Sequence, residues 1–190
     1  SEVEKAIDDL SVGKSPGPDG LSTAFYKKFK PGIAPVLHRV FSQSYQNKGL
    51  PLSFLCTHTV LIPKCNDADK LRSTSNYRPI TLANVDYKVL MKVLARRLQH
   101  VIWKIVGPHQ TCGIKGRSIG TNIHTTRSVL EVCDAEYRKV AILQIDLEKA
   151  FDRVCHDVLF SILQHVGVGS VLLEGVRMAY VNCKTKLVIN

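Results

Sequence analysis

Residues 141–154 read AILQIDLEKAFDRV, an apolar run that ends in a carboxylate, Asp146. The residues Ala141–Ile145 predict a buried strand, because they are apolar apart from one Gln. A carboxylate at the tip of a buried strand is costly unless it is paired or binds a cation, and Glu148 and Asp152 add further negative charge. A hard metal ion is one interpretation. An Asp that caps a helix or lies in a turn is the other.

A helix is predicted after this carboxylate, because apolar residues recur at helical spacing, with a restart near His156-Asp157. The recurring residues are Ala150, Phe151, Val154, Val158, Leu159, Ile162, Leu163 and Val166. The final residues, from Lys184, predict another strand. The junction between strand and helix at Asp146 is therefore the expected chemical centre.

Two short strands are predicted upstream, over Thr57–Ile62 and Tyr77–Leu82, because both segments are rich in β-branched and apolar residues. Pairing of the two would form a hairpin. Lys64 follows the first strand and Arg78 lies in the second. The pattern therefore predicts that two cations project from one hairpin.

The N-terminal segment is mainly helical by pattern. Ser1 with Glu4 predicts a capping box that opens a short helix, and further helices are predicted over residues 22–29 and in the segment that ends near Gly49. The segment Lys14–Gly20 contains two prolines and two glycines, which exclude helix and central strand. It predicts a rigid loop.

A long helix is predicted over Val85–Val106, with an apolar stripe and a basic ridge. The ridge repeats every four residues and comprises Lys88, Lys92, Arg96, His100 and Lys104. A track for nucleic acid and an ordinary solvated helix face explain it equally well. Another helix is predicted over Ser118–Tyr137, with Arg117 and Asn122 as the polar positions of interest.

Composition favours a folded protein with a basic middle third. The 190 residues carry a net charge of +10, are 45% hydrophobic and hold 22% charged residues, which argues against disorder. Residues 61–127 hold 12 basic and 3 acidic side chains, and so carry +9 of the charge. A local surplus of this kind favours a phosphate-bearing partner, although solubility alone also produces basic surfaces.

Cysteine spacing and hydropathy exclude several classes. The six cysteines show no CxxC pair and no Cys/His spacing typical of zinc fingers, which favours reduced intracellular thiols. Apolar runs are far shorter than the roughly 20 residues that cross a bilayer, and the N-terminus does not resemble a signal peptide. We expect an intracellular protein, in the nucleus or the cytoplasm, without a membrane partner.

Taken together, six segments resemble the reverse transcriptase of non-LTR (LINE-type) retrotransposons, in the order of that family. They are Lys14–Gly20; Leu61-Ile62-Pro63-Lys64; Tyr77–Leu82; Val85-Asp86-Tyr87-Lys88; Gln110 with Gly113, Gly116 and Arg117; and Gln144–Val154. The resemblance covers nearly the whole chain. It implies an α/β (α+β) fold, with residues 1–140 as fingers plus an N-terminal extension and residues 141–190 as the first part of a palm.

The resemblance also implies roles for single residues. Asp146 would be the catalytic, metal-binding aspartate, with the Leu147 carbonyl as a further ligand of two Mg²⁺ ions, or of Mn²⁺ instead. Lys64 and Arg78 would hold the incoming dNTP, and Phe151 would be the steric gate that favours deoxynucleotides, or else a core aromatic. The candidate contacts to nucleic acid are Lys14, Lys88, Lys92, Arg96 and Arg117.

The implied activity is RNA-directed DNA synthesis on an RNA template from a DNA primer, by two-metal phosphoryl transfer. The family's second carboxylate cluster lies outside these 190 residues, so we expect the rest of the palm, a thumb and an endonuclease domain in the remainder of one polyprotein. We also expect this chain alone not to polymerise. A nucleic-acid-binding remnant without chemistry and a structural helical scaffold are the alternatives.

Overall fold

The computed structural model describes residues 1–189, which form two compact units. Residues 1–95 and those from Val168 onward make the first unit, and residues 96–167 make the second. Helices and one three-stranded sheet are combined, so the predicted α/β class is confirmed. The division into fingers (1–140) and palm (141–190) concerns a complete polymerase and stays a prediction.

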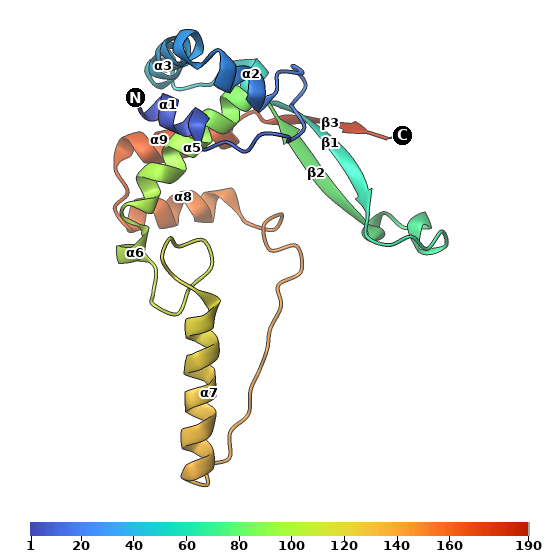
Figure 1. Ribbon diagram of the computed structural model, residues 1–190, viewed down its shortest axis with the longest axis vertical. Helices are drawn as coiled ribbons and strands as arrows, with labels where there is room; N and C mark the ends of the chain where they lie inside the picture. The colour runs from blue at the N-terminus through green and yellow to red at the C-terminus, as the bar shows by residue number, and fades with distance from the viewer. Residues whose placement is uncertain (190) are drawn as a thin grey trace. The chain divides into compact units, whose positions relative to one another are not determined.

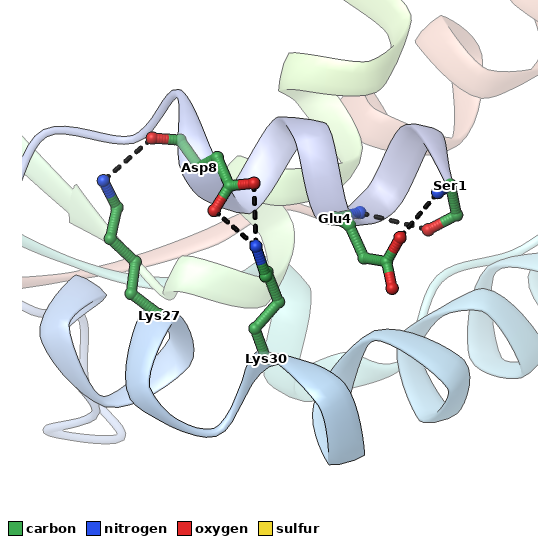
Figure 2. A network of polar contacts seen from close by, with 5 residues as sticks. All are labelled: Ser1, Glu4, Asp8, Lys27 and Lys30. Carbon is green, nitrogen blue, oxygen red and sulfur yellow. Dashed lines mark hydrogen bonds and ion pairs between the residues drawn. The ribbon is translucent and has the colours of Figure 1, made fainter.

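The first unit holds six helices among the described residues, and its amino-terminal helix is capped as predicted. They are α1 (Glu2–Asp8), α2 (Thr23–Lys28), α3 (Lys30–Asn47), α4 (Leu52–Leu55), α5 (Val85–Gln99, which continues past residue 95) and α9 (Ser170–Tyr180). The Glu4 amide donates to the Ser1 hydroxyl at 3.2 Å, and the Ser1 ammonium binds the Glu4 carboxylate at 2.6 Å (Figure 2).

An ion pair ties α1 to the start of α3. The Lys30 ammonium lies 2.8 Å from both carboxylate oxygens of Asp8, and Lys27 donates to the Asp8 carbonyl at 2.8 Å (Figure 2). The two lysines therefore close the C-terminal end of α1, where free carbonyls and the helix dipole favour cations. Pro31 lies in the first turn of α3, where its missing N–H costs no hydrogen bond.

Apolar faces of α1, α3, α5 and α9 form the core of the first unit. The most deeply buried large side chains are Ile7, Leu90, Val85 and Val89. Helix α9, which the sequence analysis did not single out, buries Gly175 and Met178. Tyr87 on α5 donates its hydroxyl to the Ala179 carbonyl of α9 at 3.4 Å, and burial raises the pKa of this phenol to about 12.

The sheet has the strand order β2-β1-β3. Strands β1 (Cys56–Pro63) and β2 (Tyr77–Ala83) form the predicted antiparallel hairpin (Figure 1), and β3 (Lys184–Val188) lies parallel to β1. Two 3₁₀ turns, Lys70–Arg72 and Thr74–Asn76, lie in the hairpin loop. The hydroxyl of the buried Thr59 lies 3.0 Å from that of Thr81 and 2.6 Å from that of Thr185, which links all three strands.

The second unit contains α6 (Ile102–Ile105), α7 (Ile119–Ala135) and α8 (His156–His165). Helix α7 confirms the helix predicted over 118–137, and its N-cap is Ser118, whose hydroxyl accepts from the Gly120 amide. Helix α8 confirms the predicted restart at His156. Among residues 1–189, no helix combines the length and the apolar character needed to span a membrane.

The predicted strand Ala141–Ile145 is wrong. These residues are irregular and exposed, with Leu143 at 81% and Ile145 at 71%. A strand persists where a neighbouring strand takes up its backbone N–H and C=O groups, and neither β1, β2 nor β3 pairs with this segment. Asp146 consequently does not lie at the tip of a buried strand. Residues 148–153 form turns rather than the start of the predicted helix.

The predicted helix Val85–Val106 is too long. Helix α5 ends at Gln99, and α6 is a separate turn. The Gln99 side chain donates to the Gly113 carbonyl at 2.8 Å and accepts from the Lys115 amide at 3.4 Å. This tertiary contact holds the end of the helix against a loop, and apolar periodicity alone contains no signal for it.

Candidate functional site

Lys64 and Arg78 lie on the same face of the hairpin, at its outer end. The strand register places Arg78 directly opposite Ile62, and the Lys64 amide continues the ladder by donating to the Asn76 carbonyl at 2.8 Å. Lys64 is two residues beyond Ile62 and so shares its face, which makes the two cations diagonal neighbours, about 7–8 Å apart at the backbone. Both are exposed, and the Lys64 ammonium donates to the Ser75 carbonyl at 2.7 Å.

The proline- and glycine-rich loop is fixed to the base of this hairpin through the buried Asn84, the residue that follows β2. Its side-chain oxygen accepts from the Asp19 amide at 3.3 Å, and its NH₂ group donates to the Ser53 carbonyl at 2.9 Å. Gly17 lies so close to Asn84 and Ala83 that a Cβ there would overlap their backbone atoms. One buried amide therefore joins the loop to α4 and to the end of β2, and the rigidity of the loop stays a prediction.

Asp86, in the first turn of α5, is a carboxyl group with a perturbed pKa. Burial raises its pKa to about 6, the nearby Asp19 carboxylate adds to the rise, and the hydrogen bond from the Tyr87 amide opposes it. Burial and the charges of Asp86 and Asp19 also raise the pKa of Tyr26. The loop thus packs against an acidic, partly buried corner rather than against a basic one.

Asp86→Asn is expected to stabilise the protein at neutral pH. Because the folded pKa of about 6 exceeds the unfolded value of 3.8, the contribution of Asp86 to stability is largest below pH 3.8 and is lost as the pH rises through 6. Asn removes that loss, so the expected gain grows between pH 4.5 and pH 7.5 and stays below about 3 kcal/mol, because solvent screens this partly exposed carboxylate. Urea unfolding at both pH values measures it.

The control for this pH dependence is Asp134→Asn, which removes an exposed carboxylate on α7. Its effect on the free energy of unfolding should stay within about 0.5 kcal/mol at both pH values. A gain for the Asp86 variant that does not grow between pH 4.5 and pH 7.5 contradicts the assignment of the raised pKa to this carboxyl group.

The basic ridge is shorter than predicted. Lys88, Lys92 and Arg96 lie four residues apart on α5 and are partly buried, but the helix ends before His100 and Lys104. The Lys104 ammonium instead lies 5.3 Å from the centroid of the Trp103 ring. Lys14 is exposed in the loop that precedes Gly17. The fold does not test whether these cations contact nucleic acid. The contacts expected for Lys14, Lys88, Lys92 and Arg96 therefore remain predictions.

Arg117 organises its own loop. Its guanidinium donates to four backbone carbonyls, those of Gly107 (2.6 Å), Gln110 (2.8 Å), Val106 (3.0 Å) and Trp103 (3.3 Å). These bonds engage both terminal nitrogens, and Asn122 adds a bond from its NH₂ group to the His109 carbonyl at 2.8 Å. A structural role is thus visible for Arg117, and its predicted contact with nucleic acid would have to use the remaining Nε–H or long-range charge.

Asp146, Leu147 and Phe151 lie in the exposed segment between α7 and α8. Within residues 1–189, Asp146 forms no hydrogen bond or ion pair, whereas Glu148 is bound by Arg153 at 2.8 Å. Phe151 is 96% exposed and lies in a turn, which excludes the alternative of a core aromatic on a helix in these described residues. Within residues 1–189 the charges of Asp146 and Asp152 are thus both open to a cation, because neither carboxylate forms a hydrogen bond or an ion pair there.

Asp146 and the Leu147 carbonyl could hold a metal ion only together with further ligands. Mg²⁺ accepts one or two protein carboxylates together with substrate phosphates, and Asp146 with the Leu147 carbonyl supplies oxygens of that kind. No group of three or more His, Cys, Asp or Glu side chains in residues 1–189 could hold a metal ion. Lys64 and Arg78 belong to the first unit and Asp146 and Phe151 to the second, so each pair is described within its own unit.

Comparison with known proteins decides the family. The family model described as reverse transcriptase (RNA-dependent DNA polymerase) matches residues 62–187, a range that contains the hairpin cations and Asp146. The chain belongs to the reverse transcriptase family. The resemblance to the enzymes of non-LTR retrotransposons is thereby confirmed, as is the expectation of a reverse transcriptase domain.

Several relatives of this reverse transcriptase chain come from transposable elements. It is 33% identical over 189 residues, 100% of its length, to the transposon TX1 uncharacterized 149 kDa protein of Xenopus laevis. It is 27% identical over 98% of its length to the retrovirus-related Pol polyprotein from the type-2 retrotransposable element R2DM of Drosophila melanogaster. It is also 28% identical over 84% of its length to the probable RNA-directed DNA polymerase from transposon BS of the same fly.

The chain spans 14%, 17% and 18% of the lengths of these three relatives. Reverse transcriptase domains as a family act on nucleic acid and generally use divalent metal ions. The family match does not assign individual contacts. The roles of the single residues therefore belong to the proposal that follows.

Proposed function

We propose that this domain serves RNA-directed DNA synthesis by a retrotransposon protein, with an RNA template, a DNA primer and dNTPs as substrates. The observation that carries the proposal is the pair of exposed cations, Lys64 and Arg78, on one face of the hairpin within the matched region. Two neighbouring cations suit a triphosphate, because charge-assisted hydrogen bonds to phosphate oxygens are among the strongest in proteins.

In the proposed reaction the primer 3′-hydroxyl attacks the α-phosphorus of the dNTP, the bond to the bridging oxygen breaks, and pyrophosphate leaves. Lys64 and Arg78 bind and orient the triphosphate. Phe151 supports this proposal through its exposure, since a steric gate must reach the sugar of the nucleotide. Asp146 and the Leu147 carbonyl would hold Mg²⁺, or Mn²⁺ in its place. Two such ions, when bound, neutralise the charge that develops on the phosphate.

Substitution of the hairpin cations tests this proposal. In the full-length protein, Arg78→Ala and Lys64→Ala are each expected to raise the KM for dNTP about 10- to 100-fold, because a charged partner of the triphosphate is lost. The control is Arg72→Ala, which removes an exposed cation from the same hairpin loop. Steady-state primer extension on an RNA template measures KM and kcat for each variant.

A KM for dNTP that stays within twofold of the unsubstituted protein in both variants would contradict the nucleotide-binding role. The second candidate function is binding of nucleic acid without chemistry, which the surplus of 12 basic over 3 acidic side chains in residues 61–127 favours. Full-length protein that binds primed RNA but incorporates no dNTP with Mg²⁺ or Mn²⁺ would support that candidate. An intracellular location, nuclear or cytoplasmic, is part of the main proposal.

A further inference from the structure

The hairpin loop carries three exposed hydroxyl side chains next to β2. They belong to Ser73, Thr74 and Ser75. The Ser73 and Ser75 hydroxyls lie 2.8 Å apart, and the proposed function gives neither of them a role. Chemistry at these hydroxyl groups would take place at the outer end of the hairpin, where Lys64 and Arg78 lie.

Ser75 is in direct contact with one of the two cations. The Lys64 ammonium donates to the Ser75 carbonyl at 2.7 Å, and the Lys64 amide donates to the carbonyl of the next residue, Asn76, at 2.8 Å. The carbonyl and the hydroxyl of one serine are only a few bonds apart, so a group attached to the hydroxyl comes within reach of the same ammonium. A phosphate on Ser75 is consequently placed beside Lys64.

Lys64 has the charge and the donors to bind such a phosphate. In the part of the chain that the structure describes, neither Lys64 nor Arg78 is paired with a carboxylate. The Lys64 ammonium has three N–H donors, one of which the Ser75 carbonyl takes. A phosphoserine carries a charge of about −1.5 to −2 at pH 7 and forms charge-assisted hydrogen bonds with cations. Phosphate on Ser75 would thus occupy a cation that the triphosphate of a dNTP needs.

The residues before Ser75 form a basic recognition sequence of the kind that protein kinases use. In the stretch KLRSTS, Arg72 lies three residues before Ser75 and Lys70 lies five residues before it. Both cations are exposed, and their ion pairs with Asp69 (3.6 Å) and Asp67 (3.4 Å) are solvent-exposed pairs that contribute little. A kinase with an acidic substrate groove selects such cations by their charge.

We propose that Ser75 is a phosphorylation site for a serine/threonine protein kinase that recognises upstream basic residues, and that its phosphate inhibits dNTP binding by pairing with Lys64. The Ser75 hydroxyl oxygen attacks the γ-phosphorus of ATP. The bond from that phosphorus to the bridging oxygen breaks, ADP leaves, and the hydroxyl proton passes to the catalytic aspartate of the kinase. The inhibition rests on the proposed function, whereas the modification itself does not.

Phosphorylation of the full-length protein tests the site. The protein is incubated with MgATP and a purified kinase that selects arginine three residues before its serine, and mass spectrometry locates the phosphate. We expect phosphate on Ser75, and Arg72→Gln should lower its rate of incorporation about 10-fold. The control is Lys5→Gln, which removes an exposed cation from α1 and should leave that rate unchanged. Phosphate on Ser73 in place of Ser75, no phosphate in the hairpin loop, or a rate independent of Arg72 overturns the site.

The inhibition is tested with full-length protein in which Ser75 is replaced by phosphoserine during translation. Primer extension should then give a KM for dNTP about 10-fold higher with kcat nearly unchanged, and removal of the phosphate by a phosphatase should restore the original KM. The matched control carries the same modification at Ser42, an exposed serine on α3 of the same unit, and should keep the original KM. A KM that phosphate on Ser75 leaves unchanged, or that phosphate on Ser42 raises equally, overturns the inhibition.

Lys64→Ala separates this inference from the proposed function. If Lys64 holds the triphosphate, its loss raises the KM, and phosphate on Ser75 should then raise it no further, because both changes remove the same contact. A raised KM in Lys64→Ala together with no effect of phosphate on Ser75 refutes the inhibition alone. An unchanged KM in both Lys64→Ala and Arg78→Ala refutes the proposed function and the inhibition with it, while mass spectrometry decides the modification independently.

Discussion

Asp146→Asn is expected to abolish DNA synthesis by the full-length protein, lowering the rate of dNTP incorporation about 1,000-fold. The substitution replaces a carboxylate that would bind a divalent cation by a neutral amide of the same shape, and such charge stabilisation amounts to several kcal/mol in the transition state. Asp146 forms no hydrogen bond or ion pair within residues 1–189, so the fold should be unaffected. Single-nucleotide primer extension measures the rate.

Two control measurements distinguish a loss of catalysis from a loss of nucleic-acid binding or a general effect of charge. The affinity for primed RNA should remain within twofold, because Asp146 carries no positive charge that could contact phosphate. Asp134→Asn, on the exposed surface of α7, removes the same charge in the same unit and should leave the rate within twofold. A variant of Asp146 that retains a tenth of the original rate would show that another group performs the role proposed for it.

Gly17→Ala is expected to destabilise the 190-residue chain by about 3 kcal/mol, which corresponds to a fall in Tm of about 6–12 °C. A Cβ at this position would overlap the side chain and backbone nitrogen of Asn84 and would lie 2.6 Å from the Ala83 carbonyl carbon. Backbone atoms at the end of a strand cannot move aside cheaply. The loop must therefore separate from Asn84, which breaks the contact with Asp19.

The control is Gly32→Ala, because a Cβ there meets no atom within 4 Å and the residue lies in the first turn of α3. Its Tm should stay the same or rise slightly, since Ala restricts the unfolded chain more than Gly does. Thermal unfolding and amide hydrogen exchange at residues 84–89 measure both variants. A Gly17 variant as stable as the Gly32 variant would contradict the close packing of the loop on the end of β2.

The parts of this protein that sequence alone predicts are those whose signals are local. The capping box at Ser1, the hairpin strands and the restart at His156 each depend on residues that are neighbours in the chain, and each is confirmed. The hairpin register follows from the strands, so the juxtaposition of Lys64 and Arg78 was also predictable. The family resemblance was predictable for a similar reason, because it rests on short motifs in a fixed order.

The predictions that fail depend on distant partners. Ala141–Ile145 has the composition of a buried strand, but pairing requires another strand at its side, and the described strands pair elsewhere. The end of α5 follows from the bonds of Gln99 to residues 113 and 115. The structural role of Arg117 also depends on tertiary contacts, since its four carbonyl partners come from residues 7 to 14 positions earlier, and its contact with nucleic acid stays a prediction.

The sequence by itself determined the family, the helical and hairpin segments, and the chemical types of the candidate residues, because these depend on residue identity and short-range spacing. Tertiary structure alone decided that β3 lies beside β1, and thereby that Lys184 and Lys186 share a face with Arg78. It also decided that Asn84 joins the loop to the hairpin. The physical reason is that register and burial arise from contacts between segments more than 100 residues apart in the first case and 65 apart in the second.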